Sequence, residues 1–345
     1  KLMKAIFRVD ASLKMGTGHV MRCLTLAQVL NENGADVEFI CRKHEGSLID
    51  KIRSSGFVVH ELEVFEETKV DNKLAHSHWL GATQQQDADD CINILKAEKL
   101  DWLIVDHYAL DEEWQKRLKP CYEKLMVIDD LADKIFDCDV LLNQNLGTQI
   151  EDYKNKIPDN CELLLGCNYA LLRSEFSDLR ERALVRRKNT IEINNILISM
   201  GGSDNENITY DILQQLDDRF NIVVVLGSSS MHSDMIAGYA EGKKIKVIID
   251  ADNMAELMLE ADLAIGAGGS TSWERCCLGL PTLLFVTAEN QRAVAENLEH
   301  SGAVIIVENL KDDLQMMASN FDLWRAISEK SQAICDGFGV KRIKI

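Results

Sequence analysis

The sequence predicts an α/β protein made of two doubly wound domains with a cleft between them. Strand-like apolar runs alternate with helix-like runs along almost the whole chain, which implies parallel sheets with helices on both faces. The alternation breaks once, between residues 143 and 168, and then restarts. The chain also has 345 residues. That is more than the roughly 250–300 residues over which a single core usually extends.

The first half begins with a strand at Ala5–Val9. A helix over 20–30 follows, because its apolar residues recur every three or four positions before Gly34 ends it. Further strands are predicted by short runs of apolar and β-branched residues at Val37–Cys41, Phe57–Leu62, Trp102–Asp106, Leu125–Asp129 and Val140–Asn143. Further helices are predicted at Leu48–Ser55 and, with clear amphipathic spacing, at Gln84–Lys99. The polar stretch Glu63–Leu80 fits neither pattern.

The break in the alternation marks the expected domain boundary. Gly147, Pro158 and Gly166 lie within it, and these residue types favour turns over helices and strands. We therefore expect an N-terminal domain over residues 1–150, a linker over 151–167 and a C-terminal domain over 168–345. The C-terminal helix would be able to pack back on the N-terminal domain.

The second half repeats the pattern after an exposed, charged helix at Arg173–Arg187. Its predicted strands are Asn195–Met200, Asn221–Leu226, Lys246–Ile249, Leu263–Ile265 and Thr282–Phe285. Its predicted helices are Asn207–Gln215, Met254–Glu260, Thr271–Leu278 and Gln291–His300. In doubly wound folds, ligands bind at the carboxyl ends of the strands, so the polar residues there are the candidates for function.

Composition limits the classes of partner. The 38 Lys and Arg against 56 Asp and Glu give a net charge of −18, which argues against broad binding of nucleic acid or anionic membranes. A phosphorylated ligand held by backbone N–H groups remains compatible with that charge. The 10 cysteines include no CxxC pair, so neither a zinc nor a thioredoxin-type site is indicated. With no apolar run of membrane-spanning length, we expect a cytoplasmic monomer with a small-molecule partner.

The first candidate site lies between the first strand and the first helix. Gly16 and Gly18 allow close backbone approach there, but Met21 occupies the third glycine position of a dinucleotide fingerprint. No Lys followed by Ser or Thr completes a P-loop either. The turn instead presents His19, whose ordinary pKa near 6.5 suits removal of a proton from water. The alternative is that His19 only caps the helix.

The second candidate site is the end of the strand Trp102–Asp106. Tyr108 could hydrogen-bond a phosphate or a sugar, and Asp106 could orient a histidine. A buried strand-end network is an equally good interpretation of these residues.

Two glycine-rich turns follow strands of the second half. Gly201, Gly202 and Ser203 precede one helix, and the segment Gly268, Gly269, Ser270 and Thr271 opens another. Their N–H groups could cradle a diphosphate, although glycine pairs are also common in ordinary turns. Glu274 lies one turn into the second of these helices and could accept hydrogen bonds from ribose hydroxyls. Asn290 and Gln291 follow the next strand and would face the same cleft.

Other polar residues have plainer interpretations. His76 and His78 are interpreted as solvated loop residues rather than metal ligands. Asp87, Asp89 and Asp90 are interpreted as a helix start favoured by the helix dipole. The pair Asp129 and Asp130 is open between cleft lining and a turn. A solvated helix face is predicted for the basic residues Arg182, Arg186, Arg187 and Lys188.

Together these segments resemble a known enzyme family, the UDP-2,4-diacetamido-2,4,6-trideoxy-β-L-altropyranose hydrolases of pseudaminic acid synthesis. That family is similar to GT-B glycosyltransferases, notably the UDP-N-acetylglucosamine transferase of peptidoglycan synthesis. The resemblance covers nearly the whole chain in consistent order, and the stretch Glu63–Leu80 is harder to match. The motifs that carry it are 16–22, 106–108, 128–131, 199–204, 266–274, 288–291 and 336–339.

The resemblance implies a GT-B fold of two Rossmann-like domains, with UDP held mainly by the C-terminal one. It implies water attack at the anomeric carbon, loss of UDP and inversion, with no metal and no cofactor. His19 matches the general base, Tyr108 a tyrosine near the diphosphate and Glu274 the ribose-binding acid, while Asp106 is assigned to the catalytic group by position. The remaining candidate contacts to substrate and UDP are Gly16, Thr17, Gly18, Arg22, Gly201, Gly202, Ser203, Gly268, Gly269, Ser270, Thr271, Asn290 and Gln291.

Three other functions stay open at the level of sequence. A GT-B transferase would replace water with a sugar or lipid acceptor. A hydrolysing UDP-N-acetylhexosamine 2-epimerase would need further carboxylates acting at C2, which the sequence does not identify. A non-catalytic nucleotide-sugar sensor would bind the ligand without turnover and would not need His19.

Overall fold

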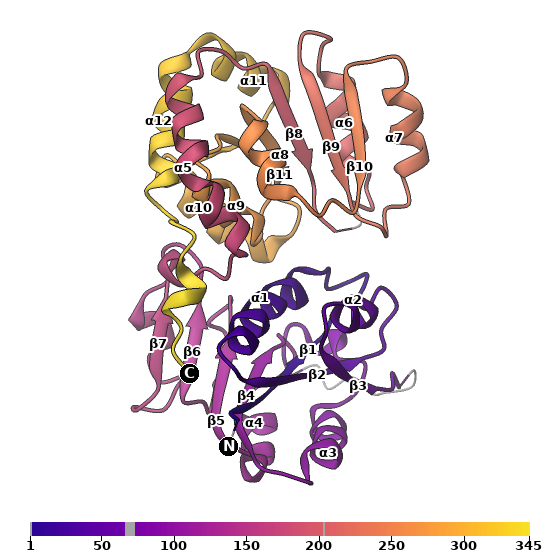
Figure 1. Cartoon of the computed structure of the whole chain (residues 1–345), viewed down its shortest axis with the longest axis vertical. Helices are drawn as coiled ribbons and strands as arrows, with labels where there is room; N and C mark the ends of the chain where they lie inside the picture. The colour runs from indigo at the N-terminus through magenta and orange to yellow at the C-terminus, as the bar shows by residue number, and fades with distance from the viewer. Residues whose placement is uncertain (1, 66–72, 203) are drawn as a thin grey trace. The chain divides into compact units, whose positions relative to one another are not determined.

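The computed structural model describes residues 2–65, 73–202 and 204–345. The chain divides into two compact units, each built around one parallel sheet (Figure 1). Unit 1 comprises Lys1–Leu171 together with Val340–Ile345, and unit 2 comprises Leu172–Gly339. The predicted α/β fold class is confirmed in both units.

Unit 1 contains a seven-stranded sheet in the order β3-β2-β1-β4-β5-β6-β7. Its strands are β1 (Lys4–Val9), β2 (Asp36–Arg42), β3 (Val58–Leu62), β4 (Leu100–Asp106), β5 (Tyr122–Ile128), β6 (Val140–Asn143) and β7 (Glu162–Leu165). Its α-helices are α1 (Gly18–Glu32), α2 (Ile49–Ser54), α3 (Gln84–Leu95) and α4 (Glu112–Leu118). Its short 3-10 helices are η1 (Ser77–Trp79), η2 (Lys119–Cys121), η3 (Ile150–Tyr153) and η4 (Cys167–Tyr169).

The core of unit 1 lies on both faces of this sheet, because successive side chains of a strand point to opposite faces. Phe7 of β1 packs in a cluster with α1 and α2. Its neighbour Ile6 packs in a second cluster with α3 and α4. The sheet is therefore covered on both sides, and functional groups are confined to its edges and strand ends.

Unit 2 contains a six-stranded sheet in the order β10-β9-β8-β11-β12-β13. Its strands are β8 (Asn195–Ser199), β9 (Asn221–Leu226), β10 (Ile245–Ile249), β11 (Leu263–Ala267), β12 (Thr282–Phe285) and β13 (Ile305–Ile306). Its helices are α5 (Ser174–Asn189), α6 (Ile208–Gln215), α7 (Ser233–Ala240), α8 (Met254–Glu260), α9 (Thr271–Cys277), α10 (Arg292–His300), α11 (Leu310–Ser319) and α12 (Phe321–Gln332). The 3-10 helices are η5 (Glu289–Gln291) and η6 (Gly339–Arg342), which continues into unit 1.

The expected boundary between the domains differs from the observed one. Residues 151–167, which we expected to be a linker, contain β7, and β7 pairs with β6 in the first sheet. The division falls after Leu171 instead. The chain returns to unit 1 at its end, where Val340 and Ile343 are buried in the same cluster as Phe7.

The polar face predicted for α5 is also partly wrong. Arg187 is only 3% exposed. Its guanidinium donates hydrogen bonds to the carbonyl oxygens of Met258 and Ala261, at 2.7 and 2.6 Å, where α8 ends. Carbonyl groups at a helix end lack partners within the helix, so Arg187 stabilises the end of α8 from the inside of unit 2.

No helix within the described ranges has both the length and the apolar character needed to cross a membrane.

Candidate functional site

The strand order of unit 1 reverses beside β1, and the first candidate site lies there. The β1 strand pairs with β2 on one side and with β4 on the other, and Val9 is in register with Asp106. Segments that leave these two strand ends therefore start next to each other. Such a switch point is where doubly wound sheets bind their ligands.

The turn before α1 directs His19 toward the end of β4. Gly16 has a φ of +75°, a conformation that favours glycine, and its N–H donates to the carbonyl oxygen of Ser12 at 2.8 Å. Thr17 is the N-cap residue of α1 and its side chain makes no capping bond. His19 lies in the first turn and its ring is turned to Asp106, so the interpretation of His19 as a helix cap is wrong.

His19 and Asp106 form a buried pair. The Nδ1 atom of His19 lies 2.8 Å from Oδ1 of Asp106, and both residues are under 10% exposed. Burial alone would raise the pKa of Asp106, but the charge of Arg22 and the hydrogen bonds from Arg22 and His19 hold it well below its usual value. An ionised carboxylate only accepts hydrogen bonds, so Nδ1 of His19 carries the hydrogen and Nε2 has the lone pair. Nη2 of Arg22 also lies 3.3 Å from Nδ1, but a guanidinium only donates, so this longer contact is no hydrogen bond when Nδ1 donates to Asp106 at 2.8 Å.

Arg22 connects this pair to a second carboxylate. Its guanidinium donates to both oxygens of Asp106, at 2.6 and 2.8 Å, and to both oxygens of Asp130, at 2.9 and 2.8 Å. Two bidentate contacts fix the plane of the guanidinium as well as its position. The structure therefore places Arg22 between two carboxylates of unit 1.

Tyr108 lies on the other side of Asp130 and beside His19. Its hydroxyl donates to Oδ2 of Asp130 at 2.6 Å, and its ring meets the ring of His19 edge-on at 4.6 Å. Burial raises the pKa of Tyr108, and the negative charge of Asp130 raises it further. Tyr108 therefore stays a phenol and a hydrogen-bond donor at neutral pH. The structure brings together His19, Asp106 and Tyr108, the three residues predicted to be catalytic.

A second buried polar network lies behind the first. Arg8 donates to Asp10 at 2.6 Å and to Asp87 at 2.6 Å, and Arg42 donates to Asp87 at 2.8 Å. All four residues have no exposed surface. Nε2 of His107 lies 2.9 Å from Asp10, while its Nδ1 accepts from a backbone N–H, so Nε2 carries the hydrogen. Asp87 does lie in the first turn of α3, as interpreted, but it is also the counter-charge of two arginines, which the sequence did not indicate.

In unit 2, the strand order reverses beside β8. The strands β8 and β11 are neighbours, and Gly266 is in register with Ser199. A Cβ atom on Gly266 would lie 2.7 Å from the carbonyl oxygen of Ser199 and 2.6 Å from Nη1 of Arg275. Only glycine fits this position without a shift of the backbone. The two predicted glycine turns thus leave adjacent strand ends.

The first of these turns has a more limited anion site than expected. Gly201 and Gly202 have positive φ values of 68° and 38°, and Ser203 lies outside the described residues. The carboxylate of Asp204 accepts the backbone N–H groups of Ile208 and Thr209, both at 3.0 Å. Those are the first amides of α6, so the chain itself satisfies them, and they are not available to a ligand.

The second turn contacts Gln291. A Cβ atom on Gly268 would lie 3.3 Å from Oε1 of Gln291, and one on Gly269 would lie 3.6 Å from Nε2. Ser270 is the N-cap residue before Thr271 and makes no side-chain capping bond. The structure thus brings Gln291 to the glycine turn. Asn290 is exposed in η5, and no contact places it with the others.

Glu274 lies on α9 within a small charged cluster. Nη2 of Arg173 is 3.6 Å from Oε2 of Glu274 and 2.9 Å from Oε1 of Glu175. Burial raises the pKa of Glu274 to about 7, against the lowering effect of the charge of Arg173. Near neutral pH this carboxyl group therefore exchanges between an acceptor form and a form that also donates.

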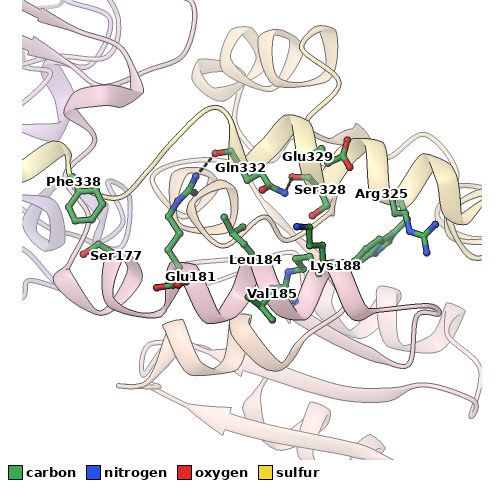
Figure 2. Close-up of a pocket in the computed structure, with 13 residues that line it drawn as sticks. Ser177, Glu181, Leu184, Val185, Lys188, Arg325, Ser328, Glu329, Gln332 and Phe338 are labelled. Carbon is green, nitrogen blue, oxygen red and sulfur yellow. Dashed lines mark hydrogen bonds between the residues drawn. The ribbon is translucent and has the colours of Figure 1, made fainter.

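Unit 2 also has a groove between α5 and α12, with a volume of about 700 Å³ (Figure 2). Arg180 in this groove donates to the carbonyl oxygens of Cys277, Cys335 and Gln332 at 2.7, 2.8 and 2.7 Å. The lining residues are Ser177, Arg180, Glu181, Leu184, Val185, Arg187, Lys188, Trp324, Arg325, Ser328, Glu329, Gln332 and Phe338. None of them is a predicted site residue, so the groove and the predicted site are separate features.

Some residues of these clusters were missed by sequence reasoning. Arg8 had a signal, because a charged residue inside an apolar strand needs a buried partner. Asp130 was left open between cleft lining and a turn, and its pairing with Arg22 and Tyr108 was not foreseen. Trp79 stands in a polar stretch without a pattern, and nothing in its spacing indicated that its ring stacks on Tyr108. In the described ranges, no group of three or more His, Cys, Asp or Glu side chains is arranged to hold a metal ion.

Comparisons with known proteins agree with this picture. Residues 185–320 match the glycosyltransferase family 28 C-terminal domain. Over 302 residues, 87% of this chain and 97% of the relative, the chain is 30% identical to a Campylobacter jejuni protein named UDP-2,4-diacetamido-2,4,6-trideoxy-β-L-altropyranose hydrolase. It is 25% identical over 355 residues to the Bacillus subtilis spore coat polysaccharide biosynthesis protein SpsG, covering 97% of this chain and 94% of that relative.

The fold has a solved counterpart. The crystal structure of Acinetobacter baumannii MurG matches with a TM-score of 0.68 at 16% identity, covering 98% of this chain and 97% of the other. At that identity the likeness concerns the fold, and it confirms the GT-B class.

Proposed function

Because this chain belongs to the UDP-2,4-diacetamido-2,4,6-trideoxy-β-L-altropyranose hydrolase family, we propose that it cleaves UDP from that nucleotide sugar by inverting attack of water, in pseudaminic acid synthesis. The family and the glycosyltransferase family 28 domain support an enzyme that acts on nucleotide sugars in sugar biosynthesis. The observation that supports hydrolysis is the hydrogen bond from Nδ1 of His19 to Asp106, which leaves Nε2 of His19 as a free base.

In the proposed reaction, Nε2 of His19 takes a proton from water as the water oxygen bonds to the anomeric carbon. The bond from that carbon to the phosphate oxygen breaks, and its electron pair leaves with UDP. Asp106 stabilises the imidazolium that forms and holds the ring in one tautomer, as carboxylates do in hydrolytic triads. Arg22 acts through Asp106 and is a positioning residue in this scheme.

The leaving diphosphate needs stabilisation of its growing negative charge. We assign this to the backbone N–H groups of the segments 201–202 and 268–271, with Gln291 beside the second. Preorganised donors of this type are effective because they need no rearrangement during the reaction. Tyr108 lies near the diphosphate in this scheme, but its hydroxyl would have to release Asp130 before it could donate to a phosphate oxygen. Glu274 is assigned to the ribose hydroxyls, and no metal ion is required by the scheme. The excess of acidic over basic residues, 56 against 38, supports a small-molecule partner over nucleic acid or an anionic membrane.

The direct test incubates the protein with UDP-2,4-diacetamido-2,4,6-trideoxy-β-L-altropyranose and EDTA, without an acceptor. We expect release of UDP and a free sugar whose first-formed anomer is inverted, followed by the anomeric proton in NMR spectra. In H₂¹⁸O the label should appear in the sugar and not in UDP. Label in UDP would contradict attack at carbon, and tight binding without release would exclude the hydrolase.

The second candidate is a GT-B transferase, which the glycosyltransferase family 28 domain at residues 185–320 favours. It differs from the hydrolase by one observable property. UDP release by a transferase would depend on an added sugar or lipid acceptor, whereas release by the hydrolase would not.

The pKa of Glu274 predicts a pH dependence of UDP binding. With a pKa of about 7, the ionised form predominates only above neutral pH, and that form accepts two hydroxyl hydrogen bonds. We expect the ratio of wild-type to Glu274→Gln affinity for UDP to rise about tenfold between pH 6 and pH 8, as the ionised fraction rises by about that factor. Titration calorimetry measures it, and comparison with the variant removes the ionisation of UDP itself.

The control for this experiment is Glu241→Gln, at an exposed glutamate that follows α7. It should keep the wild-type pH profile. A flat ratio between wild type and Glu274→Gln would remove Glu274 from the ribose site.

A further inference from the structure

The 3-10 helix η1 places an aromatic cluster beside the proposed base. The ring of Trp79 stacks on Tyr108 with centroids 5.5 Å apart and planes at 18°, and it meets His19 edge-on at 6.5 Å. His76 packs against Trp79 at 4.5 Å and against Tyr108 at 5.2 Å. Trp79 and His76, which lie outside every recognised motif, therefore both pack against Tyr108, and Trp79 also contacts His19.

Neither ring belongs to the described apolar core clusters of unit 1. The core anchor of this segment is the next residue, Leu80, which is 1% exposed and packs with α3 and α4. Trp79 and His76 keep part of their surface exposed. Packing of the core thus explains why the segment is held in place, but it does not explain two rings turned to the catalytic side chains.

His76 has a polar atom for which the described part of the chain supplies no partner. Its Nδ1 is buried and makes no hydrogen bond within the described residues. Leaving a buried nitrogen unsatisfied is unfavourable, and each such atom in a native structure calls for an explanation, such as a catalytic role. Burial also lowers the pKa of His76, and the nearby charge of Lys134 lowers it further. The neutral ring then offers one donor and one acceptor to a ligand.

We propose that Trp79 and His76 form the wall that selects the sugar, with Trp79 packing on methyl groups of a deoxygenated, N-acetylated sugar and Nδ1 of His76 bonding one of its polar groups. This inference rests on the proposed function, because it places the sugar beside His19. A 6-deoxy sugar with two acetamido groups carries three methyl groups, which suit an aromatic face better than they suit water. A sugar with a hydroxyl at C6 would lose a hydrogen bond to water there without gaining one.

The expected size of this selection is moderate. Exchange of single apolar groups in an enzyme pocket changes specificity by about 10–200-fold. Trp79→Ala should therefore lower kcat/KM for UDP-2,4-diacetamido-2,4,6-trideoxy-β-L-altropyranose by at least about tenfold. Its effect on the inhibition constant of UDP-N-acetylglucosamine, which has a C6 hydroxyl, should be much smaller.

The experiment compares wild type with Trp79→Ala, Trp79→Phe and His76→Gln in full-length protein. For each, kcat and KM are measured for the deoxygenated substrate, and dissociation constants are measured for UDP and for UDP-N-acetylglucosamine. We expect Trp79→Phe to recover most of the activity, His76→Gln to raise KM more than it lowers kcat, and UDP affinity to stay constant. The control is His300→Gln, because His300 is exposed at the end of α10 in unit 2 and should behave as wild type.

The outcomes separate this inference from the proposed function. If the wild type turns over and Trp79→Ala has an unchanged kcat/KM, the proposed role of Trp79 in sugar selection is wrong, while the proposed hydrolase activity stands. A parallel fall of UDP affinity and melting temperature in Trp79→Ala would assign the ring a purely structural role and overturn the wall as well. If the wild type shows no turnover, the proposed hydrolase activity is wrong. The role of Trp79 is then tested by binding alone: Trp79→Ala should weaken the affinity for the deoxygenated nucleotide sugar more than the affinity for UDP.

Discussion

Replacing His19 with alanine is expected to lower turnover by about 10²–10⁴-fold, the usual contribution of a general base, and to leave UDP affinity unchanged. The reason is the local geometry. Nδ1 of His19 is fixed by Asp106 at 2.8 Å, and Nε2 is the nitrogen left to accept a proton. The proposed contacts to UDP come from other residues, so binding should not depend on the imidazole.

The measurement is single-turnover release of UDP, with UDP affinity determined separately by calorimetry. A matched control is His60→Gln, because His60 on β3 also pairs with a carboxylate, at 2.6 Å from Glu38, but lies on a different strand from the site. It should keep wild-type rates. Loss of UDP binding together with activity in His19→Ala would instead indicate a role in binding or folding.

Asp87→Asn is expected to destabilise the protein by about 3–5 kcal/mol, the usual cost of removing one partner from a buried ion pair. Asp87 is fully buried between Arg8 and Arg42, and it also accepts the indole N–H of Trp114 at 2.9 Å. The amide of asparagine can replace some of these hydrogen bonds but none of the charge. Two buried guanidinium groups would then share too little negative charge.

Urea denaturation followed by tryptophan fluorescence measures this effect. The control lies two residues further along the same helix. Asp89 pairs with Arg117 at 2.6 Å, but both side chains are more than 40% exposed, and exposed pairs contribute about 0–1 kcal/mol. Asp89→Asn should therefore stay within about 1 kcal/mol of wild type. Equal unfolding midpoints for the two variants would contradict the assigned role of Asp87.

Local patterns predicted most of the fold because most of its strands are short apolar runs between clear turns. The strand β7 was missed because Pro158 and Gly166 flank it and made the segment resemble a linker. The helices α11 and α12 follow the last clear strand, where no alternation remained to suggest them. Arg187 was assigned to solvent because its neighbours are charged, and only the tertiary structure shows the carbonyl groups that it stabilises.

The same limit applies to the candidate site. His19 and Asp106 could be proposed from sequence because each stands at the end of a predicted strand or the start of a helix. Arg22 and Asp130, by contrast, are separated by 108 positions, and no local spacing indicates such a pair. Contacts of this length depend on how strands are ordered in the sheet, which hydrophobic periodicity does not encode.

The return of the chain to unit 1 has a consequence for biosynthesis. Val340 and Ile343 complete a core whose other members lie before residue 172. A ribosome makes the chain in order, so the whole of unit 2 emerges before the last piece of unit 1 is available. During synthesis of unit 2, the part of the unit 1 core that Val340 and Ile343 cover therefore stays exposed to solvent. A fragment that ends at Leu171 would keep this apolar surface exposed, and we expect it to be poorly soluble. Fusion of the segment Val340–Ile345 to its end should cover the surface and restore solubility.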